Sequence, residues 1–434
     1  MRKLEKRALI CVVLAMVLFV GLFYYVFQLA LKGESWATFE GNMLIYNEGQ
    51  LNRGKIYDRD GLLLVECNEN GVIFNEDSNI RKALAHTTGD LYGNISTGIL
   101  KSNVDKLVGY SFINGIFTID DKGEDVYLTL DAEACKVAYE ALGSHNGTVG
   151  VYNYKTGEIL CLVNKPASDP VSLSDGEGSY FNTFFQGTVI PGSTFKVVTS
   201  IAAIENLDDI DGFSYECSGG DEIKCTYSHG VVNFEEALAK SCNGAFGEIT
   251  NELGPGIMEE YVAKLGLTDS YMIEGIKTKK GEFVFSENKT ELAWSGIGQG
   301  MDRINPCSMM MLMGAIANDG ESIEPYYISN NNLLNSNADS LGQIIDKKTA
   351  ARIEAMLKNN VVVTYGEKNY ENLDIYAKSG TAEIDGQSVP NGLFTGYIKN
   401  ENHPYAFFVY VEKGGSGNQS AGVVAKKVLY SLIN

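Results

Sequence analysis

The longest apolar stretch of the chain lies near its N-terminus, from Ala8 to Leu31, and only Gln28 interrupts it. At about 1.5 Å of rise per residue, a helix of this length crosses a hydrocarbon layer of roughly 30 Å. The residues before it favour a cytoplasmic N-terminus, because four of them are basic: Arg2, Lys3, Lys6 and Arg7. The pattern predicts a cytoplasmic tail at residues 1–7, a single-pass membrane anchor at residues 8–31 and an extracytoplasmic body. The alternative is a cleaved signal peptide, but its apolar region is usually shorter, and residues 33–37 match a cleavage site poorly.

Alternating and continuous apolar runs predict one large α/β domain in the second part of the chain. A β-hairpin is expected where residues 148–152 and 158–162 flank a turn at residues 153–157. Three more strands and a helix are expected far along the chain, at residues 374–383, 393–398, 405–412 and 421–432. Helices are expected between the two groups of strands, at residues 194–205, 234–240, 245–253, 308–318 and 347–357. This order predicts a sheet built from both ends of a domain at residues 124–434, with helices on its faces.

Residues 32–123 carry no evident chemistry. Asp60-Gly61 precedes the apolar run Leu62–Val65, which predicts a turn that enters a strand. We expect this segment to fold as a small N-terminal stalk or pedestal domain between the anchor and the large domain.

Composition excludes some functions and leaves the state of the cysteines open. The formal net charge of -20 argues against nucleic acid as a partner, because phosphate binding needs clustered Lys and Arg. Of eight cysteines, Cys11 lies in the anchor, and the odd number that remains cannot all pair internally. A disulfide between Cys217 and Cys225 is left open, and the other cysteines are interpreted as small core residues. The four histidines are scattered, so no zinc site, other metal or cofactor is expected.

The first candidate catalytic motif is Pro191-Gly192-Ser193-Thr194-Phe195-Lys196, which precedes an apolar helix. Ser193 and Lys196 are three residues apart and share one helical face. At a helix start, free N–H groups favour a developing oxyanion, and an amine near apolar walls has a lowered pKa and can act as a base. The alternative is a helix cap with an extended lysine. Ser286 and Lys289 repeat the spacing in a polar segment that is predicted to be a turn.

Two further motifs follow along the chain. Ser241-Cys242-Asn243 offers a hydroxyl that can relay a proton and an amide that can hold a peptide, although helix caps use the same residues. Lys378-Ser379-Gly380-Thr381 lies on a predicted strand. Lys378, Ser379 and Thr381 offer a cation and hydroxyls to a carboxylate, and Gly380 lets a ligand approach the backbone. Lys155-Thr156-Gly157 is interpreted as turn chemistry in the first hairpin.

The order Ser-x-x-Lys, Ser-x-Asn, Lys-Ser-Gly matches the penicillin-interacting serine acyl enzymes. Over nearly all of its length the chain resembles a class B (monofunctional) penicillin-binding protein. The resemblance is also carried by segments outside the motifs: residues 53–61, 156–160, 166–170, 298–300, 305–306 and 317–320. It implies a penicillin-binding/serine β-lactamase-like transpeptidase domain, an antiparallel sheet flanked by helices, behind an anchor and a pedestal that is short for the family. The roughly 90 residues at 32–123 are too few for the glycosyltransferase domain of class A members.

The resemblance also implies a mechanism. Ser193 would attack the penultimate D-Ala of a peptidoglycan stem peptide, Lys196 would take its proton, and Ser241 would pass that proton to the leaving D-Ala amine. The backbone N–H groups of Ser193 and Thr381 would bind the oxyanion. Asn243 would orient the peptide, and the terminal carboxylate would be held by the strand motif: Lys378, Ser379 and Thr381. An amine from a neighbouring strand would then take the acyl group, and β-lactams would acylate the same serine.

Several assignments remain open after the resemblance. A D,D-carboxypeptidase, a serine β-lactamase, a β-lactam sensor and a silent scaffold are the alternatives to a transpeptidase. A sensor is expected to carry a cytoplasmic effector, and a scaffold is expected to have lost motif residues. The expected partners are stem peptides, the membrane and, by resemblance, a polytopic glycan polymerase of the SEDS family with other wall-synthesis proteins. The sequence does not choose between elongation, division and sporulation, and it does not identify the acceptor amine.

Overall fold

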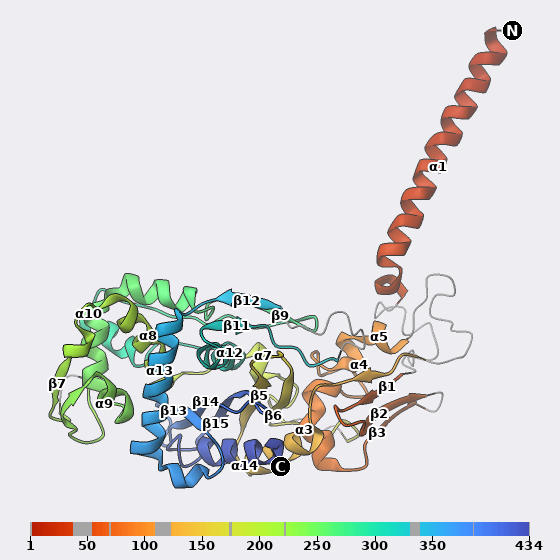
Figure 1. The fold of residues 1–434 in the computed structure, drawn as a ribbon. Helices are drawn as coiled ribbons and strands as arrows, with labels where there is room; N and C mark the ends of the chain where they lie inside the picture. The colour runs from red at the N-terminus through yellow and green to blue at the C-terminus, as the bar shows by residue number, and fades with distance from the viewer. Residues whose placement is uncertain are drawn as a thin grey trace. The chain divides into compact units, whose positions relative to one another are not determined.

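The computed structural model describes residues 2–37, 54–68, 71–108, 123–172, 176–220, 223–329, 339–384 and 386–433. The chain, which Figure 1 colours by residue number, divides into two compact units. Unit 1 comprises residues 1–57, 63–73 and 103–126, and unit 2 comprises residues 58–62, 74–102 and 127–434. Each unit is described separately below.

Unit 1 begins with a single long helix, α1 (Arg2–Ala37), which contains the expected anchor and continues beyond it. Its segment Arg2–Gly33 is long and apolar enough to cross a membrane, and its most apolar 18 residues have a mean hydropathy of 2.8. Side chains such as Phe19 (73% exposed) and Leu18 (72% exposed) contact little protein. Exposed apolar side chains on every side of a helix are costly in water and favourable in lipid.

The rest of unit 1 contains a small sheet in the order β3-β2-β1-β4. Its strands are short: β1 (Lys55–Tyr57), β2 (Leu63–Asn68), β3 (Gly71–Phe74) and β4 (Val126–Tyr127). The short helix α5 (Val104–Val108) lies between β3 and β4 in the sequence. The predicted turn between β1 and β2 is present at residues 58–62, which are counted with unit 2: Asp58 Oδ1 accepts the N–H groups of Asp60 (3.0 Å) and Leu62 (2.8 Å). Gly61 follows with φ 85°, a conformation that glycine adopts without a steric penalty.

The core of unit 2 is a five-stranded antiparallel sheet in the order β13-β14-β15-β5-β6. The strands from one end of the domain are β5 (Gly147–Asn153) and β6 (Ile159–Lys165), and those from the other end are β13 (Ile375–Ala382), β14 (Asn391–Ile398) and β15 (Tyr405–Val411). Every residue of β14 is buried, as expected for a central strand. The predicted α/β fold, with a sheet made from both ends of the domain, is therefore confirmed.

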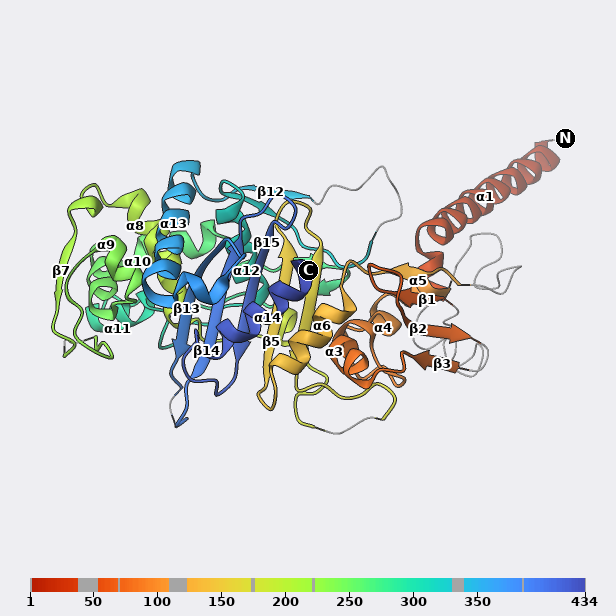
Figure 2. The ribbon, with the colours of Figure 1, turned by 60° about the horizontal axis from the view of Figure 1, so that its bottom comes forward.

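Helices cover both faces of this sheet, which lies between α12 (Pro306–Ala317) and α14 (Ala421–Ile433) in Figure 1. All residues of α12 are buried, because the helix packs on β5, β14 and β15 and has further helices behind it. On the other face, α14 packs against α6 (Ala132–Ala141) and both contact the sheet, as Figure 2 shows from another side. Asp131 caps α6 by accepting the N–H of Ala134 at 2.8 Å.

The second layer of unit 2 is helical and holds the first two candidate motifs, whereas the third lies on β13. It contains α8 (Lys196–Asn206), α9 (Phe234–Ala239), α10 (Asn243–Lys264), α11 (Lys289–Gly296) and α13 (Lys347–Asn360). α10 is longer than the predicted helix at residues 245–253, because a second helical segment begins at Pro255 after Gly254 turns the chain with φ 77°. Short elements complete the unit: α4 (Ile99–Ser102), α7 (Thr183–Gln186), β7 (Ser214–Cys217), β8 (Gly230–Asn233), β9 (Met272–Ile273), β10 (Ile276–Lys277), β11 (Glu321–Ile323) and β12 (Ser340–Gln343).

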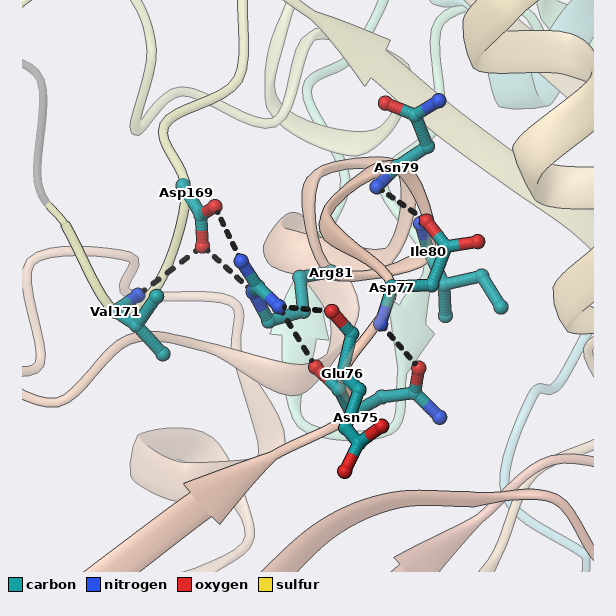
Figure 3. Close-up of polar contacts among 8 residues, drawn as sticks. All are labelled: Asn75, Glu76, Asp77, Asn79, Ile80, Arg81, Asp169 and Val171. Carbon is teal, nitrogen blue, oxygen red and sulfur yellow. Dashed lines mark hydrogen bonds and ion pairs between the residues drawn. The ribbon is translucent and has the colours of Figure 1, made fainter.

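Helix α3 (Ser78–Thr88) belongs to unit 2, although its residues fall within the segment expected to form the pedestal. Asp77 caps the helix, and Arg81 forms a two-pronged ion pair with Asp169 through Nε–Oδ1 (2.9 Å) and Nη2–Oδ2 (2.8 Å) (Figure 3). The Arg81 guanidinium also donates to the carbonyls of Asn75 and Glu76. The helix packs on α6 and β6, which the sequence did not predict, and the expected boundary at residue 123 stays a prediction.

Candidate active site

Ser193 lies in a single 3-10 turn, η2 (Gly192–Phe195), which runs directly into α8. Gly192 starts the turn with φ 52°, and its N–H donates to the carbonyl of Gly298 at 2.8 Å. Lys196 is the first residue of α8, so Ser193 precedes it by one tight turn on the same side. Ser193 is half-buried and lines a cleft, whereas α8 is buried from Lys196 to Ala203. The sequence predicted this serine at the start of a buried helix, and the structure places it there.

The amine of Lys196 is enclosed beneath the cleft and has three hydrogen-bond partners. It donates to the Ser241 carbonyl (2.7 Å), to Ser241 Oγ (3.1 Å) and to Asn243 Oδ1 (2.7 Å). The Phe246 ring lies on another side, with its centroid 5.6 Å from Nζ. Burial lowers the pKa of Lys196 from 10.5 to about 7, because removal from water penalises the charged form. A substantial fraction of this amine is therefore neutral near pH 7 and able to accept a proton.

Ser241 occupies a strained position between α9 and α10. Its φ of 55° is in the left-handed region, which costs a non-glycine residue roughly 1–2 kcal/mol. This backbone conformation turns both its carbonyl and its Oγ toward Lys196. Outliers of this kind persist where the surrounding structure holds them, and they cluster at functional sites.

Lys378 on strand β13 reaches the same hydroxyl from the opposite side. Its Nζ lies 3.0 Å from Ser241 Oγ and 2.8 Å from the carbonyl of Ser379, and the residue is 1% exposed. Burial lowers the pKa of Lys378 well below its usual value, and the charge of Lys196 lowers it further. The two lysines thus share one serine, and the Lys378 amine lies behind the cleft, whereas Ser379 and Thr381 line its surface.

The strand motif and the serine turn are in direct backbone contact. A Cβ on Gly380 would lie 2.9 Å from Thr194 Cγ2 and 3.0 Å from the Pro191 carbonyl, and one on Gly192 would lie 2.7 Å from the Thr381 carbonyl. Only glycine permits so close an approach. In the described part of the chain β13 is one of the two edge strands of its sheet, so its outer side is free to face η2.

The cleft above these groups has a volume of about 560 Å³. Of the residues predicted from sequence, Ser193, Ser241, Asn243, Ser379 and Thr381 line it. Lys196 and Lys378 lie beneath it, and Gly380 forms the contact with η2. The structure thus brings all eight predicted site residues into one region, although their roles stay predictions.

The sequence did not reveal other residues that line or support the cleft. Residues 224–227 and His229, from the connection between β7 and β8, form one wall. Gln299 donates to the carbonyl of Thr381 at 3.2 Å. Tyr365 accepts the N–H of Ser379 at 2.7 Å and donates to its Oγ at 3.0 Å. The only sequence signal was the pair of glycines around Gln299, because neither the wall nor Tyr365 follows a recognisable spacing.

The two decoy motifs lie at turns. Lys155 and Thr156 sit in the hairpin between β5 and β6, where Asn153 Oδ1 accepts their N–H groups, and the Lys155 amine binds Asn318 Oδ1 at 2.6 Å. Ser286 Oγ accepts the N–H of Asn288, the residue that caps α11. Neither set lines the cleft, so three-dimensional context separates the catalytic motifs from their repeats.

The interpretation of the cysteines and histidines needs correction. Cys217 and Cys225 are free thiols, as are the other cysteines. Although their spacing resembles no zinc site, Cys217, Cys225, His229 and Cys242 converge, with their ligand atoms all within 4.8 Å of one another. Cys242 is buried, as expected of a core residue, but it and His229 lie beside two further potential metal ligands. Folding of the connection between β7 and β8 onto the start of α10 brings the four together.

Taken together, a buried amine and cleft-lining hydroxyls are the groups that a serine–lysine acyl-transfer site requires. The chain belongs to the family described as the penicillin binding protein transpeptidase domain, whose family model matches residues 147–434. The motif order, the antiparallel sheet and the site geometry are all consistent with this membership.

Relatives and solved structures extend the comparison. The chain is 24% identical over 358 residues to stage V sporulation protein D of Bacillus subtilis, covering 73% of this chain and 54% of that protein. It is 23% identical over 379 residues to peptidoglycan D,D-transpeptidase PbpA of Mycolicibacterium smegmatis, covering 75% and 74%. The penicillin G acyl-enzyme complex of penicillin-binding protein A from M. tuberculosis matches with a TM-score of 0.74 and 21% identity, over 88% of this chain and all of that one. The chain spans about half the length of several curated relatives, stage V sporulation protein D among them.

Proposed function

We propose that the chain is a peptidoglycan D,D-transpeptidase that cross-links stem peptides through an acyl-enzyme on Ser193 and that penicillins acylate at the same residue. The observation that carries this proposal is the shared hydroxyl of Ser241, which lies 3.1 Å from Lys196 Nζ and 3.0 Å from Lys378 Nζ beneath the cleft that Ser193 lines. Relatives named peptidoglycan D,D-transpeptidases support the choice of substrate.

The proposed proton path follows these contacts. Neutral Lys196 takes the proton of Ser193 as its Oγ attacks the carbonyl of the penultimate D-Ala. Ser241, hydrogen-bonded to the resulting ammonium, passes a proton to the departing D-Ala amine. The Lys378 amine, which donates to the same oxygen, favours the electron-rich Oγ of Ser241 during that transfer and, when protonated, disfavours a lasting charge on Lys196. In the second half-reaction an acceptor amine attacks the ester, and the same groups act in reverse.

Substrate contacts are assigned to the residues that reach the cleft. The hydroxyls of Ser379 and Thr381 would bind the terminal carboxylate, with Lys378 adding its charge from behind. The backbone N–H groups of Ser193 and Thr381 would bind the oxyanion, since η2 and β13 meet there. Asn243, held by Lys196 and by the carbonyl of Lys224, would orient the peptide.

Labelling with a fluorescent penicillin tests the acyl-enzyme. The full chain in detergent should label covalently, Ser193→Ala should not label, and Lys155→Ala, at the decoy motif, should label as the wild type does. Labelling of Ser193→Ala would remove the nucleophile assignment. Absence of labelling in the wild type would favour a silent scaffold.

Product analysis separates a transpeptidase from the hydrolases. With a stem-peptide substrate and an added amine acceptor, the released D-Ala should be matched by amide product. Equal release of D-Ala without amide product would indicate a D,D-carboxypeptidase. Loss of the penicillin label within seconds would indicate a β-lactamase.

The anchor and a polymerase partner complete the proposal. α1 would hold the catalytic unit outside the cytoplasmic membrane, beside a SEDS-family glycan polymerase and other wall-synthesis proteins. Pull-down of the full chain, compared with a chain in which residues 1–37 are exchanged for an unrelated membrane anchor, tests that contact. Equal recovery of the polymerase by both chains would show that α1 does not specify the partner.

A further inference from the structure

Three thiols and an imidazole converge on one wall of the cleft. Cys217 ends β7, Cys225 and His229 lie in the connection to β8, and Cys242 precedes α10. Their ligand atoms all lie within 4.8 Å of one another. Cys217 and Cys242 are buried, whereas Cys225 and His229 are partly exposed, so a metal ion can enter from the cleft side. No contact in the mechanism above uses these four side chains.

The distances inside this cluster match those of a tetrahedral metal site. Cys225 Sγ and Cys242 Sγ are 3.8 Å apart, and Cys217 Sγ and His229 Nδ1 are 3.3 Å apart. Zinc at about 2.3 Å from sulfur and about 2.0 Å from nitrogen places two sulfurs roughly 3.8 Å apart and a sulfur and a nitrogen roughly 3.5 Å apart. These two distances are already close to those of a bound ion, and the remaining pairs, all within 4.8 Å, need to close by at most about 1 Å to enclose it.

The donor set points to zinc held for a structural purpose. Three cysteines and one histidine fill all four positions of a tetrahedral site and leave none for water, unlike a catalytic zinc site. The backbone N–H of Asn243 donates to Cys225 Sγ at 3.1 Å, and Ser228 Oγ donates to the Cys217 carbonyl at 2.8 Å. Hydrogen bonds of this kind orient the ligands of metal sites and stabilise thiolates.

Packing holds the β7–β8 hairpin only in part, through contacts of β7 with α10 and of β8 with α9. Its two strands have four residues each, and most of these residues are exposed or only partly buried. An isolated two-stranded hairpin is marginally stable in water. A metal ion that joins the end of β7, its connection to β8 and the start of α10 supplies the missing constraint.

We propose that Cys217, Cys225, His229 and Cys242 bind one zinc ion, which fixes the wall formed by residues 224–229 and the turn that carries Ser241 and Asn243. Cys242 stands between these two residues in the sequence, so a metal bond to its sulfur restrains both. Asn243 is also tied to the wall, because its Nδ2 donates to the carbonyl of Lys224 at 2.8 Å. The ligands are positioning residues, because they act on the substrate through Ser241 and Asn243.

A disulfide between Cys225 and Cys242 is the competing state, because the cluster lies on the side of the membrane where thiols oxidise. It would consume two of the four ligands and exclude the metal. In the structure all three thiols are free. The zinc form and the disulfide form are thus mutually exclusive and give different masses and metal contents.

The first experiment measures metal. The full chain, purified in detergent without added metal, should contain about one zinc ion per molecule by mass spectrometry of the elements. His229→Ala and Cys225→Ser should fall below about a tenth of that content, whereas Cys67→Ala, a buried cysteine outside the cluster, should keep it. Cobalt exchanged into the wild type should give the sulfur-to-cobalt charge-transfer absorption of thiolate ligands. The proposal is overturned by a wild-type chain that takes up neither ion after reduction, by equal zinc in the ligand variants, or by a Cys225–Cys242 disulfide in the native chain.

The second experiment measures positioning and rests on the proposed acylation of Ser193. Zinc-free His229→Ala should label with fluorescent penicillin about tenfold more slowly than the wild type. His229→Cys restores a four-ligand zinc site and should restore zinc together with most of the labelling rate. Normal labelling of metal-free His229→Ala would refute the positioning role, while the zinc content would still test the site. Failure of the wild type itself to label would count against the proposed function and not against the metal site.

Discussion

Acylation by this chain should depend on pH through Lys196. Its amine is enclosed by Ser241, Asn243 and the Phe246 ring and faces the second buried lysine, Lys378. Burial lowers the pKa of Lys196 to about 7, while the Cys242 and Cys225 thiols, as anions, oppose that shift. The base works as the neutral amine, so the rate of labelling should rise as pH passes upward through this value.

The size of the effect follows from the fraction of neutral amine. With a pKa of about 7, that fraction is roughly 0.09 at pH 6 and roughly 0.9 at pH 8, so the rate should rise about tenfold. An ordinary lysine, with a pKa near 10.4, would show its inflection more than three units higher. Lys196→Arg should remove labelling at every pH, because a guanidinium stays protonated.

Initial rates of labelling by fluorescent penicillin between pH 5.5 and pH 9.5 are the assay, with saturation of the wild type at each pH as the reference. Zinc content and circular dichroism should be followed over the same range, so that metal loss or unfolding is separated from titration of Lys196. The Lys155→Arg chain is the matched control and should follow the wild-type curve. A flat profile from pH 6 to pH 8, or an inflection only near pH 10, would refute the assignment of Lys196 as the base.

Three further outcomes are expected from the packing around the site and the fold. Tyr365→Phe leaves the partly buried N–H of Ser379 without its partner, at a cost of about 1 kcal/mol. It should raise the penicillin concentration needed for half-maximal labelling more than it lowers the limiting rate. Gly417→Ala places a Cβ 2.2 Å from the carbonyl of Gly380, so it should displace β13 and slow labelling, and a wild-type rate would contradict this packing. Arg81→Ala should lower the free energy of urea unfolding by about 3 kcal/mol, because it leaves a largely buried carboxylate unpaired, and a loss below about 1 kcal/mol would mean that the pair behaves as a surface one.

Local sequence patterns were enough to predict the strands of the central sheet and to locate the three motifs. The apolar alternation of residues 148–162 and the long strands after residue 374 predicted β5, β6 and β13–β15, because a central sheet imposes its period on the sequence. The Pro-Gly step before Ser193 and the apolar run after it predicted a buried helix start for the same reason. α10 was underpredicted because Gly254-Pro255 is typical of a helix end, although a second helical segment follows it.

The features that the sequence could not predict depend on which residues the fold brings close together in space. The proposed zinc site draws on β7, its connection to β8 and the start of α10, and the spacing of its four residues in the sequence resembles no zinc motif. Tyr365 lies in the irregular turn η4 (Val361–Tyr365) at the end of α13, where periodicity carries no information. The position of the Lys378 amine behind the cleft also needed coordinates, since a strand pattern shows the face of a residue and not the reach of its side chain.

Burial of the Lys196 amine is unfavourable for its charged form, and this explains why the surrounding elements are rigidly packed. A shift of the Lys196 pKa from 10.5 to about 7 corresponds to about 5 kcal/mol between its protonated and neutral forms. Because the unfolded chain holds this proton more tightly than the folded one between those values, Lys196 makes stability rise with pH over that window and lowers it below. A flexible pocket would open to water and solvate the charged amine, and the pKa of Lys196 would return toward 10.5. Rigid neighbours therefore serve the chemistry because they exclude water from the Lys196 amine. They are the buried helix α8, the strand β13 held against η2 through glycine contacts, and the proposed zinc, which joins the Ser241 turn to the wall.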